Sequence, residues 1–129
     1  LANPGASVFS IGFPLFNVMG TEAKFSDGKI SSKTGYQNAV NSFQTTVPIQ
    51  PGNSGSPLFN DKGEVIGIAN AISKEADNVS YAIKVAYLVN LMELLTEPVS
   101  PPARPIPADV SLEDKIKLLR QYVTLIKVR

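Results

Sequence analysis

The sequence predicts an all-β domain that is followed by two helices. Six short apolar segments precede residue 86, and Gly, Pro, Asn and Asp residues separate them, as expected for strands joined by turns. After residue 85 the apolar spacing becomes helical, with Leu88, Leu91, Met92 and Leu95 on one face. The predicted strands are Ser7–Gly12, Ala23–Ser32 (one bulged strand or two short ones), Phe43–Thr46, Leu58–Phe59, Glu64–Ile72 and Val79–Val85.

The pattern divides the chain into three parts. Residues 1–96 form the β domain and its closing helix, Ala86–Thr96. Residues 97–110 are rich in proline and are expected to form an extended linker. Residues 111–129 predict an amphipathic helix, with an apolar stripe over about four turns. Three roles stay open for that stripe: docking on the same β domain, self-association of copies through residues 111–127, or the start of a further element.

Composition narrows the classes of function. The net charge is +1 and no basic stripe alternates with aromatic residues, so nothing indicates a nucleic-acid partner. No apolar run is long enough to span a bilayer. The chain has no cysteine, which excludes disulfides and cysteine-bound metals, and no cofactor or metal ion is expected. It also has no histidine, which limits the chemistry that it can perform alone.

A glycine-flanked serine lies between two apolar strands. Residues 51–57 read Pro-Gly-Asn-Ser-Gly-Ser-Pro, so the backbone can turn sharply on both sides of Ser54. Such a turn exposes the Ser54 hydroxyl, and the amides of Gly52 and Ser54 could converge on a carbonyl oxygen that gains charge during attack. The simpler interpretation is a glycine-rich surface turn. A nucleophile elbow of the Gly-x-Ser-x-Gly type is excluded, because Ser56 occupies its last glycine position.

Several ordered motifs surround this serine. They are Ser10–Pro14, Phe43–Thr46, Gly52–Phe59, Gly63–Ile68 and Ser80–Ile83. Together they resemble the nucleophile region of trypsin-like serine proteases, and most of all the bacterial HtrA/DegP-type branch, over about residues 5–96. The resemblance implies that this chain is the second barrel of a two-barrel fold. That barrel would be a six-stranded antiparallel Greek-key barrel with a closing helix.

The resemblance also assigns roles to residues around the serine. Ser54 would be the nucleophile, and Gly52 and Asn53 would belong to the oxyanion-hole loop. Pro48, six residues before the serine, would lie at the base of the primary specificity pocket, and Ile49 beside it would contact substrate. Because Pro48 has no carboxylate, we expect a preference for apolar or small side chains on the acyl side of the cut bond.

Three more expectations follow from the same resemblance. An extended substrate peptide would pair with the backbone of Ser80–Lys84 as an added strand. Asn53 stands where digestive relatives have an aspartate, so activation by a newly cut N-terminus is not expected. Ser56 replaces the usual second glycine, and a positive φ there would strain it. The expected substrate contacts on the Ser80–Lys84 stretch are Tyr81, Ala82 and Ile83.

The missing histidine sets the functional prediction. In trypsin-like proteases a histidine accepts the serine proton and an aspartate orients that histidine. We therefore expect a fragment of a serine endopeptidase whose missing N-terminal barrel supplies both residues, and no activity from this chain alone. The resemblance implies peptide or unfolded protein substrates and a location outside the cytoplasm, in the periplasm or cell envelope. The alternative is a noncatalytic peptide-binding or scaffold protein that kept the fold and lost the base.

Overall fold

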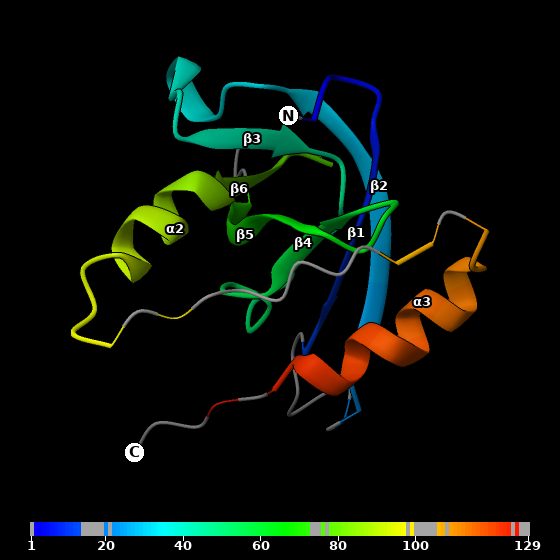
Figure 1. Cartoon of the computed structure of the whole chain (residues 1–129). Helices are drawn as coiled ribbons and strands as arrows, with labels where there is room; N and C mark the ends of the chain where they lie inside the picture. The colour runs from blue at the N-terminus through cyan, green and yellow to red at the C-terminus, as the bar shows by residue number, and fades with distance from the viewer. Residues whose placement is uncertain are drawn as a thin grey trace.

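The predicted strands are all present, and their bounds differ from the prediction by at most one residue at each end. The computed structural model describes residues 2–13, 20, 22–72, 76, 78–97, 99, 106–107, 109–124 and 126. Ala23–Ser32 forms one strand with a register shift between Ile30 and Ser32, which is the bulged alternative. The strands are β1 (Ser7–Gly12), β2 (Lys24–Ser32), β3 (Ser42–Thr45), β4 (Pro57–Asn60), β5 (Val65–Ile72) and β6 (Ser80–Lys84) (Figure 1).

The six strands close into an antiparallel barrel in the order β1-β2-β3-β6-β5-β4. Strands β4, β5 and β6 follow one another as neighbours, and β3 lies beside β6, which is a Greek-key arrangement. Pairing of β1 with both β2 and β4 closes the barrel. The predicted fold class, a six-stranded antiparallel barrel with helices after it, is therefore confirmed.

Strand β1 is buried on both of its faces. Successive strand residues point to opposite sides, so Val8 packs inside the barrel with Leu58, whereas Phe9 and Ile11 face outward. The outward Phe9 ring stacks on Phe59 of β4 with centroids 5.2 Å apart. This outer face needs a cover, because two aromatic rings are costly to leave in water.

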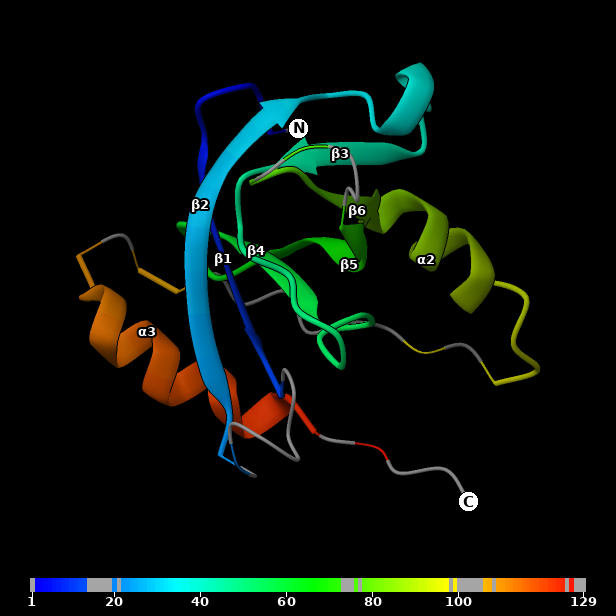
Figure 2. The ribbon, with the colours of Figure 1, turned by 180° about the vertical axis from the view of Figure 1, so that it is seen from behind.

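Helix α3 (Leu112–Leu119) provides that cover. Its Leu119 is buried against Phe9, Ile11 and Phe59, and Lys115 is buried while its Nζ donates to the Asp61 carbonyl. Figure 2 shows α3 lying along the β1–β2 side of the barrel. Of the three roles left open by the sequence, docking on the same barrel is the one that the structure shows.

The two ends of α3 differ in how well they match the prediction. Ser111 caps the helix, with its hydroxyl accepting from the Asp114 amide at 3.2 Å, as its sequence position indicates. The helix ends at Leu119, continues as the 3-10 turn η2 (Arg120–Tyr122), and becomes extended at Val123. The predicted helix over 111–129 is thus too long, and Val123, although extended, still packs against the Phe9, Ile11 and Phe59 cluster.

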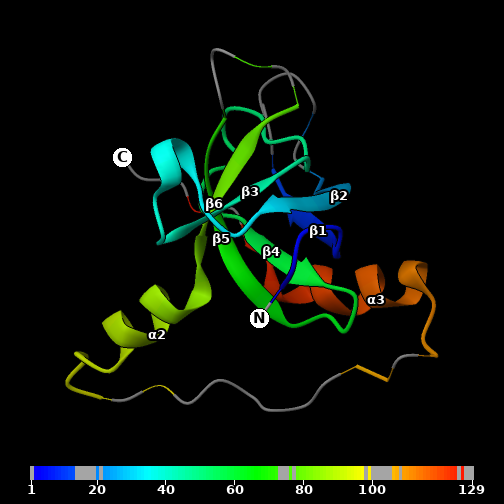
Figure 3. The ribbon, with the colours of Figure 1, turned by 90° about the horizontal axis from the view of Figure 1, so that it is seen from above.

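Helix α2 (Val85–Met92) projects away from the barrel on the side opposite α3 (Figure 3). It is shorter than the predicted Ala86–Thr96 helix, and none of its residues is buried. Leu91 is 63% exposed, and Leu94, just beyond the helix, is 81% exposed. A helix with this composition is normally covered, so α2 presents an unusually apolar surface to solvent.

Two remaining segments complete the description. A 3-10 turn, η1 (Tyr36–Asn38), interrupts the loop between β2 and β3. Most of the predicted proline-rich linker over 97–110 lies outside the described residues. Among the residues that are described, no helix has the length and apolar character needed to cross a membrane.

Candidate active site

Two consecutive turns build the loop that carries Ser54. The Asn53 amide donates to the Gln50 carbonyl at 2.9 Å, and the Ser56 amide donates to the Asn53 carbonyl at 3.1 Å. The third residue of each turn is a glycine with positive φ, 91° at Gly52 and 89° at Gly55. This combination defines type II turns, for which glycine is the preferred third residue. Asn53 closes the first turn and opens the second.

Strand β5 holds the second turn in place. The Gly55 amide donates to the Ala69 carbonyl at 2.7 Å, and the Ala69 amide donates to the Ser56 carbonyl at 2.8 Å. These bonds continue the β4–β5 pairing beyond the end of β4. The turn is therefore fixed to the barrel through its backbone, while Ser54 itself stays exposed at the tip.

The Ser54 hydroxyl has an acceptor but no base. Its Oγ donates to the Asn70 carbonyl of β5 at 3.1 Å. A peptide carbonyl can accept this hydrogen bond, but it cannot take the proton as imidazole does. The chain has no histidine to fill that role.

Two amides beside the hydroxyl have no hydrogen-bond partner among the residues that the structure describes. Within the described part of the chain, the amides of Asn53 and Gly55 are engaged in the bonds above, whereas no bond involves those of Gly52 and Ser54. These are the two donors expected from the sequence to form an oxyanion hole. An oxyanion hole requires amide donors that are free to bind the substrate oxygen, and these two amides meet that requirement.

The side chain of Asn53 points into the protein. It is 3% exposed, and its Oδ1 accepts a 2.9 Å hydrogen bond from the Ser56 hydroxyl. Both groups lie against Gly12 at the end of β1, where an added Cβ would meet Asn53 Oδ1 and Ser56 Oγ. Ser56 is absent from the positive-φ residues, so the strain anticipated there does not exist; Gly55 takes the left-handed conformation instead.

The expected substrate-contacting residues do not all reach the surface. Pro48 is exposed, and Tyr81 and Ile83 are partly exposed. Ile49 is 5% exposed and Ala82 is fully buried in the barrel core, so Ala82 cannot contact a substrate in this structure. Tyr81 meets Tyr36 edge-on, with ring centroids 6.2 Å apart.

Strand β6 has no free edge for a substrate peptide. It pairs with β3 from Ser42↔Ile83 to Thr45↔Ser80, and with β5 from Gly67↔Lys84 to Ile72↔Ser80. The expectation that substrate pairs with the Ser80–Lys84 backbone is therefore wrong. The free edge belongs to β5, because its pairing with β4 stops at Ile68 and the turn bonds reach only Ala69. From Asn70 onward, beside Ser54, no strand among the described residues covers that edge.

Comparison with known proteins identifies the family. The family model of the trypsin-like peptidase domain matches residues 1–68, and the chain belongs to this family. A relative from Hahella chejuensis, named "Probable periplasmic serine endoprotease DegP-like", is 37% identical over 99 residues, which are 72% of this chain and 20% of that protein. The resemblance to the HtrA/DegP-type branch is thereby confirmed. The chain spans about a fifth of the length of the curated relatives that it matches, 17–23% for three of them.

Solved structures agree with this family. The serine endoprotease from Yersinia pestis is 33% identical, with a TM-score of 0.59, over 71% of this chain and 31% of that one. Rv3671c from M. tuberculosis is 17% identical, with a TM-score of 0.60, over 77% of this chain and 52% of that one, and shows the shared fold. The barrel described above is thus the trypsin-like fold.

Proposed function

We propose that this chain carries the nucleophile and the oxyanion hole of a serine endopeptidase. The observation that carries the proposal is the Ser54 turn, where an exposed hydroxyl lies beside the two unengaged amides of Gly52 and Ser54. The hydroxyl oxygen would attack a peptide carbonyl, and the resulting oxyanion would accept hydrogen bonds from both amides. Asn53 contributes to this loop through its inward side chain rather than through its own amide.

The general base comes from outside this chain. Attack requires that the Ser54 proton move to a base of suitable pKa, and among the described residues the acceptor bonded to it is the Asn70 carbonyl. An N-terminal barrel with a histidine and an aspartate would supply the base and its orienting group. The apolar residues of α2 would offer such a partner a contact surface, since none of them is buried.

Substrate would bind as a strand along β5. The β5 edge is unpaired from Asn70 onward, next to Ser54, so a peptide lying there brings its backbone to the nucleophile. Pro48, with Tyr81 and Ile83 farther along the barrel, would shape the pocket for the residue on the acyl side. None of these three side chains is a carboxylate, so we keep the expectation of apolar or small residues at that place.

A noncatalytic peptide-binding role is the second candidate. The observation in its favour is that the Ser54 hydroxyl is bonded to a backbone carbonyl in a chain without histidine. The free β5 edge would bind peptide in either case. The two candidates differ in whether Ser54 ever gains a base.

Labelling with a fluorophosphonate probe separates the two candidates. The probe would be applied to a polypeptide in which a trypsin-like N-terminal barrel with a histidine and an aspartate is joined to this chain. We expect labelling that Ser54→Ala abolishes and that Ser42→Ala, a buried serine in β3, leaves intact. Equal labelling of the parent and its Ser54→Ala variant would exclude Ser54 as the nucleophile, and no labelling at all would favour the noncatalytic role.

We further propose a location in the periplasm or cell envelope and protein substrates. The support is the name of a relative, a periplasmic DegP-like endoprotease that is 37% identical to this chain. Fractionation of cells that express the parent polypeptide tests this proposal directly. Recovery in the cytoplasmic fraction would contradict it.

A further inference from the structure

Three residues from two distant segments meet behind the nucleophile turn. Ser56 Oγ donates to Asn53 Oδ1 at 2.9 Å, and the two residues are 9% and 3% exposed. A Cβ on Gly12 would lie 1.9 Å from Asn53 Oδ1 and 2.3 Å from Ser56 Oγ, so only glycine leaves room for both groups. We call Gly12, Asn53 and Ser56 the latch.

The latch acts where the two turns join. Asn53 is the last residue of the first turn and the first residue of the second, since its amide and its carbonyl each close one of them. A fixed Asn53 side chain therefore restricts both turns at once. The amides of Gly52 and Ser54 lie on either side of this junction, so their direction depends on where Asn53 is held.

We infer that Ser56 is a positioning residue for the Ser54 nucleophile and its oxyanion donors; this inference rests on the proposed function. Without the Ser56 hydroxyl, Asn53 Oδ1 would be buried with no donor, because the described residues offer it no other hydrogen bond. An unsatisfied buried acceptor is costly, so the Asn53 side chain would move toward water. The junction between the turns would then lose its fixed conformation.

Amide hydrogen exchange of the 129-residue chain measures how strongly the latch stabilises the turn. The amides of Gly55 and Ser56 report on the turn, because they are bonded to Ala69 and Asn53. We expect Ser56→Ala to raise their exchange rates about fivefold or more, in line with the loss of one hydrogen bond. Barrel amides such as that of Ala82 should be unaffected.

Ser42→Ala is the matched control for this experiment. Its hydroxyl also donates to an asparagine Oδ1, that of Asn41 at 3.1 Å, and it is 7% exposed, but it lies in β3 opposite Ile83, away from the turn. It should leave exchange at Gly55 and Ser56 unchanged. In a chain that already carries Asn53→Ala, adding Ser56→Ala should have no further effect. Unchanged exchange in the Ser56→Ala variant would overturn the inference.

Binding of phenylboronic acid tests the positioning role separately. Its boron would bond to Ser54 Oγ, with the hydroxyl proton released to solvent, and the tetrahedral boronate oxygens would face the amides of Gly52 and Ser54. We expect Ser56→Ala to weaken this binding about fivefold and Ser42→Ala to leave it unchanged. Equal affinity of the Ser56→Ala variant and the wild type would show that the latch does not position the nucleophile. Measured on a polypeptide in which an N-terminal barrel supplies the base, a lack of boronate binding by the wild type would contradict the proposed function, whereas the role of the latch is tested separately by hydrogen exchange.

Discussion

The shape of the candidate site comes from residues that have little or no side chain. Gly52 and Gly55 adopt φ values of 91° and 89°, which let two type II turns follow each other without a break. Apart from Gly55 itself and its two chain neighbours, no atom would lie within 4 Å of a Cβ added at Gly55, so crowding by other parts of the fold does not explain this glycine. The positive φ of Gly55 explains why a glycine stands at this position.

Replacing Gly55 separates backbone strain from packing. Gly55→Ala should lower the free energy of unfolding by about 1–2 kcal/mol, because a Cβ at this φ meets the following carbonyl. Gly55→Asn should cost less, since asparagine tolerates the left-handed conformation. Urea denaturation gives both values. Variants as stable as the wild type would mean that the turn relaxes to another form.

Sequence reasoning reached part of this site. Ser54, Gly52 and the turn are contiguous, so local glycine chemistry was enough to place them. The contact of Asn53 and Ser56 with Gly12 joins two distant stretches of the chain through the β1–β4 pairing. No local pattern encodes such a contact. The positive φ that would have strained Ser56 falls on Gly55 instead.

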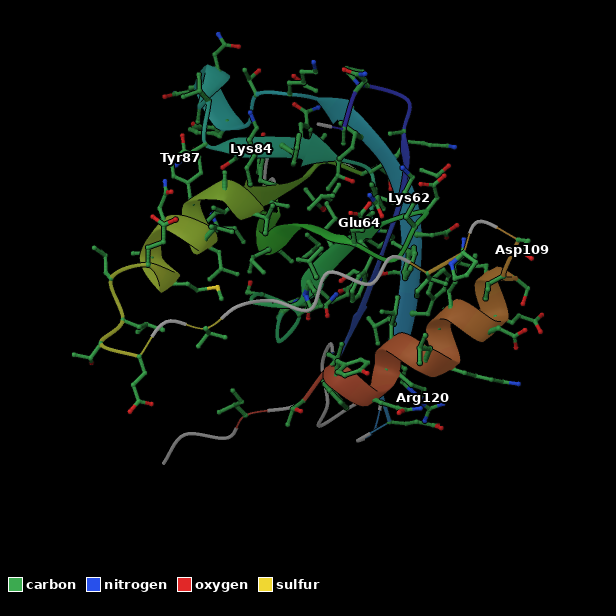
Figure 4. All side chains as sticks on the ribbon, viewed as in Figure 1. Lys62, Glu64, Lys84, Tyr87, Asp109 and Arg120 are labelled. Carbon is green, nitrogen blue, oxygen red and sulfur yellow. The ribbon has the colours of Figure 1, made fainter. Side chains whose placement is uncertain are left out.

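At the scale of elements, α3 completes the core from outside the barrel. Its Leu119 packs with Phe9, Ile11 and Phe59, and Ile116 lies at the margin of the same cluster. Figure 4 shows Arg120 at the end of this helix, where its guanidinium lies 3.9 Å from Glu22 across exposed surface. That exposed pair contributes little, so the docking of α3 depends on apolar contacts and on the hydrogen bond from Lys115 to the Asp61 carbonyl.

Two neighbouring leucines of α3 test this dependence. Leu119, which is 8% exposed, should lose about 2 kcal/mol or more of unfolding free energy on replacement by alanine, because a cavity forms against Phe9 and Phe59. Leu118 is 43% exposed on the same helix, and its alanine variant should stay within about 0.5 kcal/mol of the wild type. Urea denaturation of both variants provides the comparison. Equal losses would mean that α3 does not dock as described.

The sequence pattern predicts where the strands lie better than it predicts which strands and helices contact one another. All six strands follow from apolar alternation and turn residues, since these signals are local. The pairing of β6 on both edges and the docking of α3 depend on which distant segments meet. No local pattern therefore indicates that both edges of β6 are paired or that the last helix docks on the barrel.

At the scale of the whole molecule, one side of the protein is covered and the other is not. The outer face of β1 and β4 lies under α3, whereas α2 and the residues after it expose Leu91, Leu94 and Leu95. Contiguous exposed leucines favour association with another surface. The barrel thus carries an apolar helix that no described part of the chain buries.

This surface should make the isolated chain self-associate. Light scattering of the purified protein is expected to show species larger than a monomer at high concentration. Leu91→Glu together with Leu94→Glu should reduce association, because charge opposes contact between the exposed helices. The control Leu118→Glu, on the exposed side of α3, should not. A monodisperse wild-type monomer would contradict the prediction.

The isolated chain should also be unable to cleave peptides. Without a base, the remaining oxyanion donors give too little acceleration for turnover to be measured. Incubation with an unfolded protein such as casein, followed by mass spectrometry, should show no products. Cleavage that disappears in the Ser54→Ala variant would prove this wrong.

The Asn70 carbonyl oxygen accepts the hydrogen bond of the Ser54 hydroxyl. A backbone N–H of a peptide bound beside β5 would compete for the same oxygen. If a peptide adds to the β5 edge as proposed, its first N–H would approach the same carbonyl that now holds the serine proton. Arrival of substrate would thereby loosen the hydroxyl at the moment an imidazole needs it. Without a peptide on that edge, the Ser54 hydroxyl stays hydrogen-bonded to the Asn70 carbonyl, as it is in this structure.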